Sequence, residues 1–181
     1  MLAITDSILN LSKIESGTMP LTLRVFDFAG VLREATRAAQ PLAERANNRI
    51  TLQGAENIGG MYGDKEKIRY TLNGLLDNAC RFTRQGQITI SAAREMRDGA
   101  EWYRVSVSDT GAGMTPGQLA HVFEPFTQAD PTIIREHGTT GLTLAIGRRY
   151  CAMLGGALDA ASEPGKGSTF TLQLPVRVNA K

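Results

Sequence analysis

The sequence has few of the residues and patterns that mark several common protein classes. It has only two cysteines, Cys80 and Cys151, with no CxxC spacing and no neighbouring histidine cluster. We therefore expect neither a disulfide framework nor a metal site at these residues, and we expect both to be buried free thiols. The chain also lacks an apolar run of the roughly 18 residues that a membrane span needs, and its first residues lack the basic region of a signal peptide. These absences predict a cytoplasmic location without membrane contact.

Charge is almost balanced, which argues against a second group of functions. The 20 basic and 18 acidic residues leave a net charge of +2, so we expect no general attraction to nucleic acid or to an anionic membrane. With 42% hydrophobic and 21% charged residues, the chain lies outside the range of disordered proteins. Its 181 residues suit one domain with a short appended element, at roughly 100 to 200 residues per domain.

Hydrophobic spacing and turn signals predict the order of the elements. Helices are expected over residues 4–14, 28–46, 65–83 and 141–154, and a short helix after Thr115. Asp27 and Asp64 are expected to cap the second and third of these. Alternating side chains predict strands over residues 21–25, 49–53, 88–92, 103–109, 157–162 and 170–176, with another around Met61 and a hairpin turn at Asp98-Gly99. The expected fold class is an α/β (α+β) two-layer sandwich, in which helices cover one face of a mixed, mostly antiparallel sheet.

Asp109 and the glycines after it form the first candidate site. Asp109 ends a strand in phase with Val105 and Val107, so its carboxylate is expected to point the same way as the buried side chains. A carboxylate there needs donors, which are either local backbone amides or the N–H groups of a ligand such as a purine amine. Gly111 and Gly113 follow, and two glycines one residue apart allow the backbone to approach a flat ligand closely.

Asn78 marks a second candidate site, on the helix that begins after Asp64. Helical geometry places Gly74, Arg81 and Phe82 on the same flank, and it directs Asp77 to the opposite, solvated side. An amide oxygen with a guanidinium one turn away suits a magnesium-bound polyphosphate. The alternative is a structural hydrogen bond from the amide to a neighbouring loop.

The segment from Gly138 to Gly141 leads directly into a helix and forms the third candidate site. Free amides and the dipole at a helix N-terminus bind anions, and Arg135 stands just upstream as a cationic contact. An ordinary capped loop is the alternative for this segment alone. The fixed order of the three sites along the chain is a stronger signal than any one of them.

In that order the residues resemble the catalytic, ATP-binding domain of sensor histidine kinases, within the superfamily that includes gyrase, heat-shock chaperone and mismatch-repair ATPases. Residues 75–83 resemble the N box of this family, 109–114 its G1 box, 123–126 its F box and 138–144 its G2 box. Residues 8–17 are similar to the end of the second dimerisation helix. The resemblance implies a Bergerat ATP-binding fold over residues 20–177, preceded by a remnant of the dimerisation helix and a linker at 1–19.

The resemblance also implies roles for individual residues, with ATP and Mg²⁺ as cofactors. Asn78 is implied to ligate the magnesium and Asp109 to accept a hydrogen bond from the adenine amine. Further nucleotide-binding positions are implied at Arg81, Phe82, Gly111, Gly113, Phe126, Arg135, Gly138, Thr139, Thr140, Gly141 and Leu142. Residues 127–140 are implied to form the ATP lid. The implied partners are the dimerisation helices of the same kinase and a response regulator or receiver domain.

Three residues depart from the family pattern. Gly74 stands four residues before Asn78, where the kinases usually have Asn and the related ATPases a Glu that activates water, so no general base for hydrolysis is expected there. Thr139 and Thr143 stand where the family usually has glycine, and a β-branched residue resists positive φ and close backbone approach. These departures put phosphate binding by the G2 box in question.

Two histidines are present, His121 and His137, and neither has the sequence context of a phosphoacceptor. We therefore expect a domain that binds Mg-ATP and transfers the γ-phosphoryl group to a His on a dimerisation domain outside this chain. A degenerate, non-catalytic binding module is the alternative, because of the departures at 74, 139 and 143. A protein serine kinase of the anti-sigma type is a third hypothesis, which the remnant at 8–17 disfavours.

Overall fold

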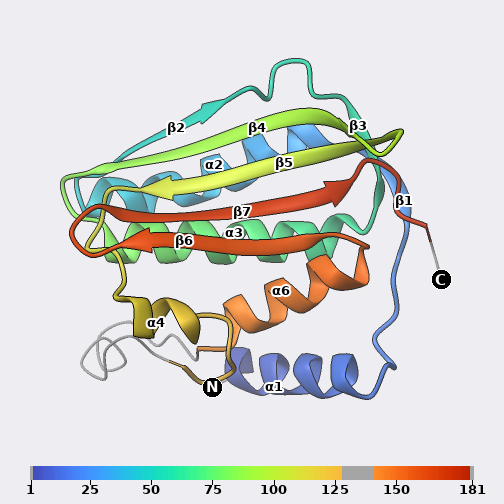
Figure 1. Ribbon diagram of the computed structural model, residues 1–181, viewed down its shortest axis with the longest axis horizontal. Coiled ribbons are helices and arrows are strands. Elements are labelled where there is room, and N and C mark those ends of the chain that lie inside the picture. Colours follow the sequence, from blue (N-terminus) through green and yellow to red (C-terminus); the bar gives the residue numbers. More distant parts are fainter. Residues whose placement is uncertain (1, 128–140, 180–181) are drawn as a thin grey trace.

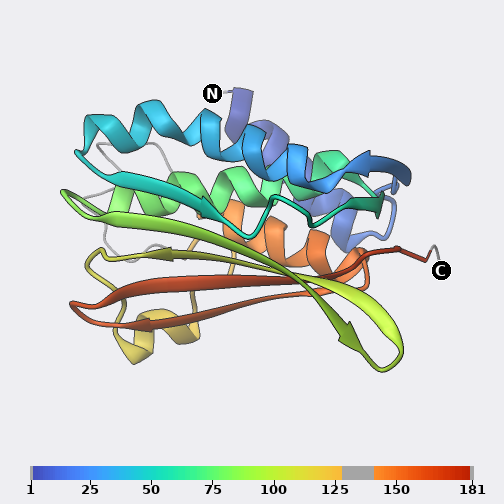
Figure 2. The ribbon, with the colours of Figure 1, turned by 90° about the horizontal axis from the view of Figure 1, so that it is seen from above.

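The protein is described by a computed structural model over residues 2–127 and 141–179, without the side chains of residues 2–4. Two layers make up the fold, and Figure 2 shows them edge-on, with the longer helices on one side and the sheet on the other. In chain order the elements are α1 (Leu2–Glu15), β1 (Arg24–Asp27), α2 (Phe28–Arg45), β2 (Arg49–Gln53), β3 (Gly60–Gly63), α3 (Lys65–Phe82), β4 (Gln87–Arg97), β5 (Ala100–Asp109), α4 (Pro116–Ala120), α6 (Thr143–Met153), β6 (Ala157–Glu163) and β7 (Gly167–Pro175).

The main sheet has five strands in the order β2-β4-β5-β7-β6 (Figure 1). Only the β2–β4 pair is parallel, and the other neighbours are antiparallel. A separate two-stranded sheet pairs β1 with β3. The expected mixed, mostly antiparallel sheet with helices on one face is therefore confirmed.

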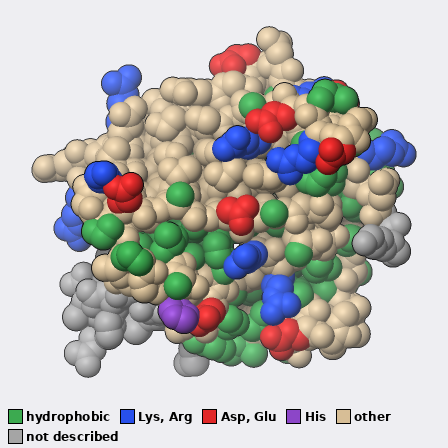
Figure 3. Space-filling view, viewed as in Figure 1, with side chains coloured by type: hydrophobic (Ala, Val, Ile, Leu, Met, Phe, Trp, Pro, Cys, Tyr) green, Lys and Arg blue, Asp and Glu red, His purple; other side chains and the backbone are tan. Residues whose placement is uncertain are grey.

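The core lies between the sheet and the layer that contains α2, α3 and α6. Every second residue of the central strands is buried there, including Ile88, Ile90, Val105, Val107 and Leu172. Hydroxyl pairs occupy the other face of the sheet: Ser108 and Thr169, for example, share a hydrogen bond of 2.9 Å across β5 and β7. In Figure 3 this open face consists mainly of uncharged polar side chains and backbone.

The helix α1 packs against α6 through a second, smaller apolar cluster. Leu11 of α1 is buried there together with Leu142, Ile146 and Tyr150. Ile8 and Leu9 remain about half exposed on the same helix. None of the described helices is both long and apolar enough to cross a membrane.

The capping aspartates behave differently from each other. Asp64 is confirmed as a cap, since its carboxylate accepts from the backbone N–H of Lys67. Asp27 occupies the N-cap position of α2 but makes no capping hydrogen bond. Its carboxylate instead accepts from Arg33 at 3.0 Å, on the surface. Several element boundaries also differ from expectation. β1 begins at 24 rather than 21, α6 begins at 143 rather than 141, and the hairpin strands β4 and β5 extend to 97 and from 100.

Candidate functional site

Asp109 ends β5 at the edge of the helical layer, in phase with the buried Val107. Its Oδ1 accepts a hydrogen bond of 2.9 Å from the backbone N–H of Gly111. Burial raises the pKa of this carboxyl group, and hydrogen bonds from the amides of Gly111 and Ser168, together with the nearby Thr83 hydroxyl, only partly offset the rise. Local donors therefore stabilise Asp109 in part, and its charge remains under-solvated.

Thr83, which the sequence did not single out, lies beside Asp109 at the end of α3. It is fully buried. Its hydroxyl is near enough to Asp109 to lower the pKa of that carboxyl, yet its Oγ1 makes no hydrogen bond of normal length to the described residues. Buried polar groups are nearly always paired. The Asp109–Thr83 pair thus has unused hydrogen-bonding capacity.

Gly111 and Gly113 are required by the protein's own backbone. A Cβ at Gly111 would lie 2.3 Å from the carbonyl oxygen of Phe82, at the end of α3. Gly113 has a φ of +68°, and a Cβ there would lie 2.0 Å from the carbonyl oxygen of Glu163. The two glycines therefore hold the loop after β5 between α3 and the β6–β7 turn. The sequence predicted a close approach to a ligand, whereas the close approach seen is to the chain itself.

Asn78 and Arg81 lie on α3, within one turn of Phe82. The Asn78 side chain is half-buried and makes no hydrogen bond to another described residue. Arg81 donates from Nε to Asp77 Oδ2 at 2.8 Å. The Asp77 side chain is 40% exposed, as the prediction of a solvated side requires, but it does not lie opposite Arg81. Residues four apart on a helix meet on one flank, and Asp77 orients the Arg81 guanidinium.

The start of α6 presents free backbone amides. Leu142 is its N-cap, and no side chain caps the helix. The first amides of a helix have no partner within it, so those of 143–145 remain available to an anion. The Leu142 side chain is fully buried in the cluster with α1, so only its backbone can contact a ligand.

The two ends of the expected lid are joined. The N–H of Phe126 donates to the carbonyl of Gly141 at 3.2 Å, and Gly141 has a φ of +67°. Phe126 itself is 64% exposed, also with a positive φ. Phe123 anchors the segment by packing edge-on against Phe170 at 6.0 Å. Several sequence-predicted positions lie outside the described residues: Arg135, Gly138, Thr139 and Thr140, together with His137.

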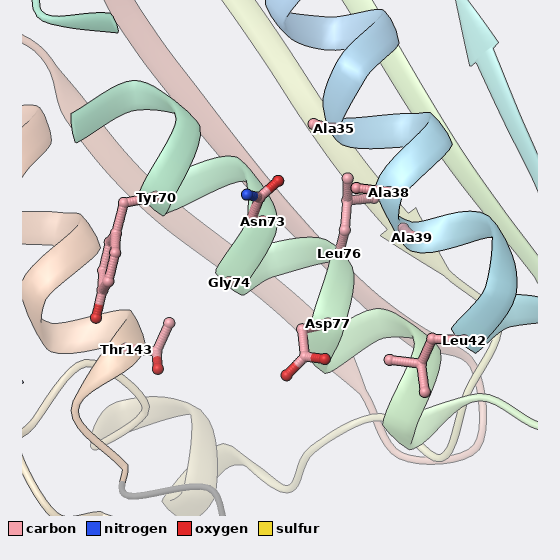
Figure 4. Close-up of a pocket in the computed structure, with 10 residues that line it drawn as sticks. All are labelled: Ala35, Ala38, Ala39, Leu42, Tyr70, Asn73, Gly74, Leu76, Asp77 and Thr143. Carbon is pink, nitrogen blue, oxygen red and sulfur yellow. The ribbon is translucent and has the colours of Figure 1, made fainter. Parts of the chain in front are cut away.

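A cavity of about 410 Å³ lies on the helical layer, floored by α3 and walled by α2 and the start of α6 (Figure 4). It is lined by Ala35, Ala38, Ala39, Leu42, Tyr70, Asn73, Gly74, Leu76, Asp77 and Thr143. It brings together Gly74 and Thr143, two of the three departures noted in the sequence. Asn78, further along α3, and Asp109, at the end of β5, are not among its lining residues. Figure 1 shows the loop after β5, α4 and the start of α6 at the same end of the molecule.

The candidate site thus combines an open cavity at the start of α6 with a partly buried carboxylate, Asp109, that lies outside this cavity at the end of β5. Residues 63–178 match the family of histidine kinase-, DNA gyrase B- and HSP90-like ATPases. The chain belongs to this family.

Within the family the similarity is to sensor kinases. The chain is 34% identical to the autoinducer 2 sensor kinase/phosphatase LuxQ of Vibrio parahaemolyticus, over 98% of this chain and 21% of that protein. It is 34% identical to the sensor protein TorS of Escherichia coli, over 98% of this chain and 19% of that protein. The chain thus spans about a fifth of the length of these curated relatives.

Solved structures agree with this placement. Full-length ShkA in complex with AMPPNP superimposes with a TM-score of 0.84 and 29% identity, over 99% of this chain and 36% of that one. The catalytic domain of the histidine kinase ThkA shares the fold, with a TM-score of 0.71 and 23% identity, over 88% of this chain and 97% of that one. The chain is the catalytic, ATP-binding domain of a sensor histidine kinase.

Proposed function

We infer that this domain binds Mg-ATP along α3, with adenine at Asp109 and the phosphates at the start of α6, and donates the γ-phosphoryl group to a histidine. The observation that carries the assignment is the spare hydrogen-bonding capacity of the half-buried Asp109 and of the fully buried Thr83 beside it. A carboxylate that faces an incoming N–H group suits the adenine amine. The AMPPNP complex of the structural relative ShkA supports the same ligand class.

The residues fit Mg-ATP at three points along one helix. Phe82 and Thr83 border the adenine end, and Asn78 stands one turn earlier with an amide oxygen that no described residue uses. An amide oxygen is a hard ligand of the kind that Mg²⁺ accepts, usually beside phosphates and waters. Gly74, one further turn back, adjoins the start of α6. At 1.5 Å per residue these contacts extend over about 12 Å of α3.

ATP supplies the reacting phosphoryl group, and the chain's own groups hold it in place. Phosphoryl transfer depends mainly on positioning and on stabilisation of negative charge. Asp109 fixes the base, and the amides of 143–145 bind phosphate oxygens. Asn78 would hold the Mg²⁺ ion, whose charge would offset that of the phosphates. Arg81, held by Asp77, adds a cation at the same flank.

The acceptor histidine is proposed to lie on a dimerisation domain outside this chain. His121 pairs with Glu124 at 2.8 Å and is exposed, so we assign it to surface structure. We assign residues 1–19 to the end of the dimerisation helix and its linker, and 20–177 to the catalytic domain. The partners are then the dimerisation helices and a receiver domain, on the cytoplasmic side, as sensor kinases require.

Calorimetric titration with Mg-ATP tests the binding step. The parent chain is expected to bind, and Asn78→Ala is expected to weaken Mg-ATP roughly tenfold, since about 1.4 kcal/mol corresponds to one amide–metal contact. Metal-free ATP is expected to lose much less affinity in the same variant. Asn57→Ala, in an exposed loop, is the matched control. Absence of binding to the parent at millimolar Mg-ATP would favour a non-catalytic module.

Transfer is tested separately by adding labelled ATP and a purified dimerisation domain from a sensor kinase of this type. Label is expected on the histidine of the added domain and not on His121 of this chain. Label that appears on this chain alone would contradict the assignment of the acceptor. His121→Gln serves as the control, because it removes that side chain and leaves the nucleotide contacts intact.

A further inference from the structure

Gly74 and Thr143 are in direct contact across the crossing of α3 and α6. A Cβ built on Gly74 would lie 2.3 Å from Cγ2 of Thr143 and 3.7 Å from its Cβ. Figure 4 shows Thr143 beside Gly74, with its methyl end toward the helix and its hydroxyl turned away. The Thr143 methyl therefore fills the volume that a side chain at 74 would occupy.

The same crossing holds a second pair with the roles reversed. A Cβ on Gly147 of α6 would lie 3.1 Å from Cγ2 of Thr71 on α3. Each helix thus contributes one glycine and one threonine, and each threonine methyl lies over the glycine of the other helix. Glycine is a poor helix former, so a buried glycine in the middle of α3 is best explained by this close approach.

The two threonines differ in what their hydroxyls do. Thr71 Oγ1 donates to the carbonyl of Lys67 at 2.9 Å, within its own helix. Thr143 Oγ1 makes no hydrogen bond to another described residue, and Thr143 lines the cavity. Thr143 also begins α6 without a positive φ. The strain that its β-branched side chain predicts at a glycine position is therefore absent.

We propose that Gly74 and Thr143 are an exchanged pair: α6 supplies the side chain that α3 lacks, and the Thr143 hydroxyl is a nucleotide-positioning group at the phosphate end of the proposed nucleotide site. This proposal rests on the proposed function, because its ligand is the phosphate chain of ATP. The two departures from the family pattern, at 74 and 143, then compensate for each other. A hydroxyl at the first position of a helix, next to free amides, adds one more hydrogen-bond donor for a phosphate oxygen.

The exchange is tested without nucleotide, by moving one methyl group between the two residues. Gly74→Ala is expected to lower Tm by roughly 4–8 °C, because the new methyl overlaps Cγ2 of Thr143. In a Thr143→Ser background the same change is expected to raise Tm by about 2–4 °C, because alanine is the better helix former and the overlap is gone. The double variant has the same atomic composition as the parent. If Gly74→Ala shifts Tm equally in both backgrounds, the exchange is overturned.

The hydroxyl is tested by calorimetry with the Mg complex of the β,γ-imido analogue of ATP. Thr143→Val keeps the methyl over Gly74 and removes the hydroxyl, and is expected to weaken binding roughly tenfold with little change in Tm. Thr71→Val is the matched control, since its hydroxyl bonds within α3, and its affinity is expected to equal that of the parent. Parent-like affinity in Thr143→Val would overturn the positioning role. If the parent itself fails to bind, the proposed function fails, whereas the Tm comparison still decides the exchange.

Discussion

Asp109→Asn is expected to weaken ATP binding roughly a hundredfold, the loss that follows when a hydrogen bond to a charged acceptor is removed from a partly buried site. The Gly111 amide donates to Oδ1 at 2.9 Å, and local donors offset only part of the effect of burial on the carboxylate, so we expect it to accept a further hydrogen bond from the adenine amine. An amide in its place presents a donor as well as an acceptor, and it cannot carry the charge. Calorimetric titration of both proteins with Mg-ATP measures the difference.

A nucleotide with a different base provides the control for this prediction. Inosine triphosphate has a carbonyl oxygen where ATP has its amine, and the phosphates are unchanged. The parent is expected to bind ATP far more tightly than inosine triphosphate, and Asp109→Asn is expected to lose most of that preference. A variant that keeps the preference would remove Asp109 from the adenine contact even if its overall affinity fell.

The same substitution is expected to leave the fold intact. Burial raises the pKa of Asp109 above its usual range, which means that the fold disfavours the charged form. Above that raised pKa the carboxylate therefore costs stability, and the cost is relieved as the pH falls through it. At neutral pH we expect Asp109→Asn to have a Tm equal to or higher than that of the parent, by thermal unfolding. A large fall in Tm would mean that lost binding reflects damage to the fold.

Local signals predicted most of the fold because most elements are specified by nearby residues. The hairpin at Asp98-Gly99 is one example: the two residues take φ values of +50° and +78°, and the flanking strands alternate as expected. Thr115 is another, since it forms a complete capping box with Gln118. Such features depend on residues within three or four positions, which a sequence displays directly.

The candidate site was less predictable where it depends on contacts between distant segments. Gly74 and Thr143 each depart from the family pattern, and nothing in either local sequence indicates that one fills the space above the other. Thr83 was missed for the same reason, because its burial beside Asp109 arises from the packing of the end of α3 on β5. Asp77 was misplaced because a helical wheel gives a direction from the axis, whereas the neighbouring helix and Arg81 decide what that flank faces.

Asp64→Asn is expected to lower the free energy of unfolding by about 3 kcal/mol, the cost of breaking a buried charge pair. Its carboxylate is 3% exposed and 2.9 Å from the Lys67 ammonium, and it also accepts from the backbone N–H of Thr22 at 2.9 Å. Lys67 in turn donates to the carbonyl of Pro20 at 2.7 Å. The pair therefore fastens the segment before β1 to the start of α3.

Asp27→Asn is the matched control, because Asp27 holds the equivalent N-cap position of α2 without capping it. Its ion pair with Arg33 is exposed on both sides, and such pairs contribute about 0–1 kcal/mol. Denaturant unfolding of the two variants and the parent separates the cases. If Asp64→Asn and Asp27→Asn lowered the free energy of unfolding equally, the buried network around Asp64 would contribute no more stability than a surface ion pair.

The pH dependence of the Asp64 effect has a definite sign. Burial acts to raise the pKa of Asp64, but hydrogen bonds from Thr22 and Lys67 outweigh it, and the pKa lies below its usual value. A lowered pKa in the folded state contributes stability above the unfolded pKa of about 3.9, and that stability is lost as the pH falls through the folded value. The difference in free energy of unfolding between the parent and Asp64→Asn is therefore expected to be largest at neutral pH and to decrease below about pH 4. If this difference stayed constant below about pH 4, the side chain of Asp64 would stabilise the fold by its shape and not by its charge.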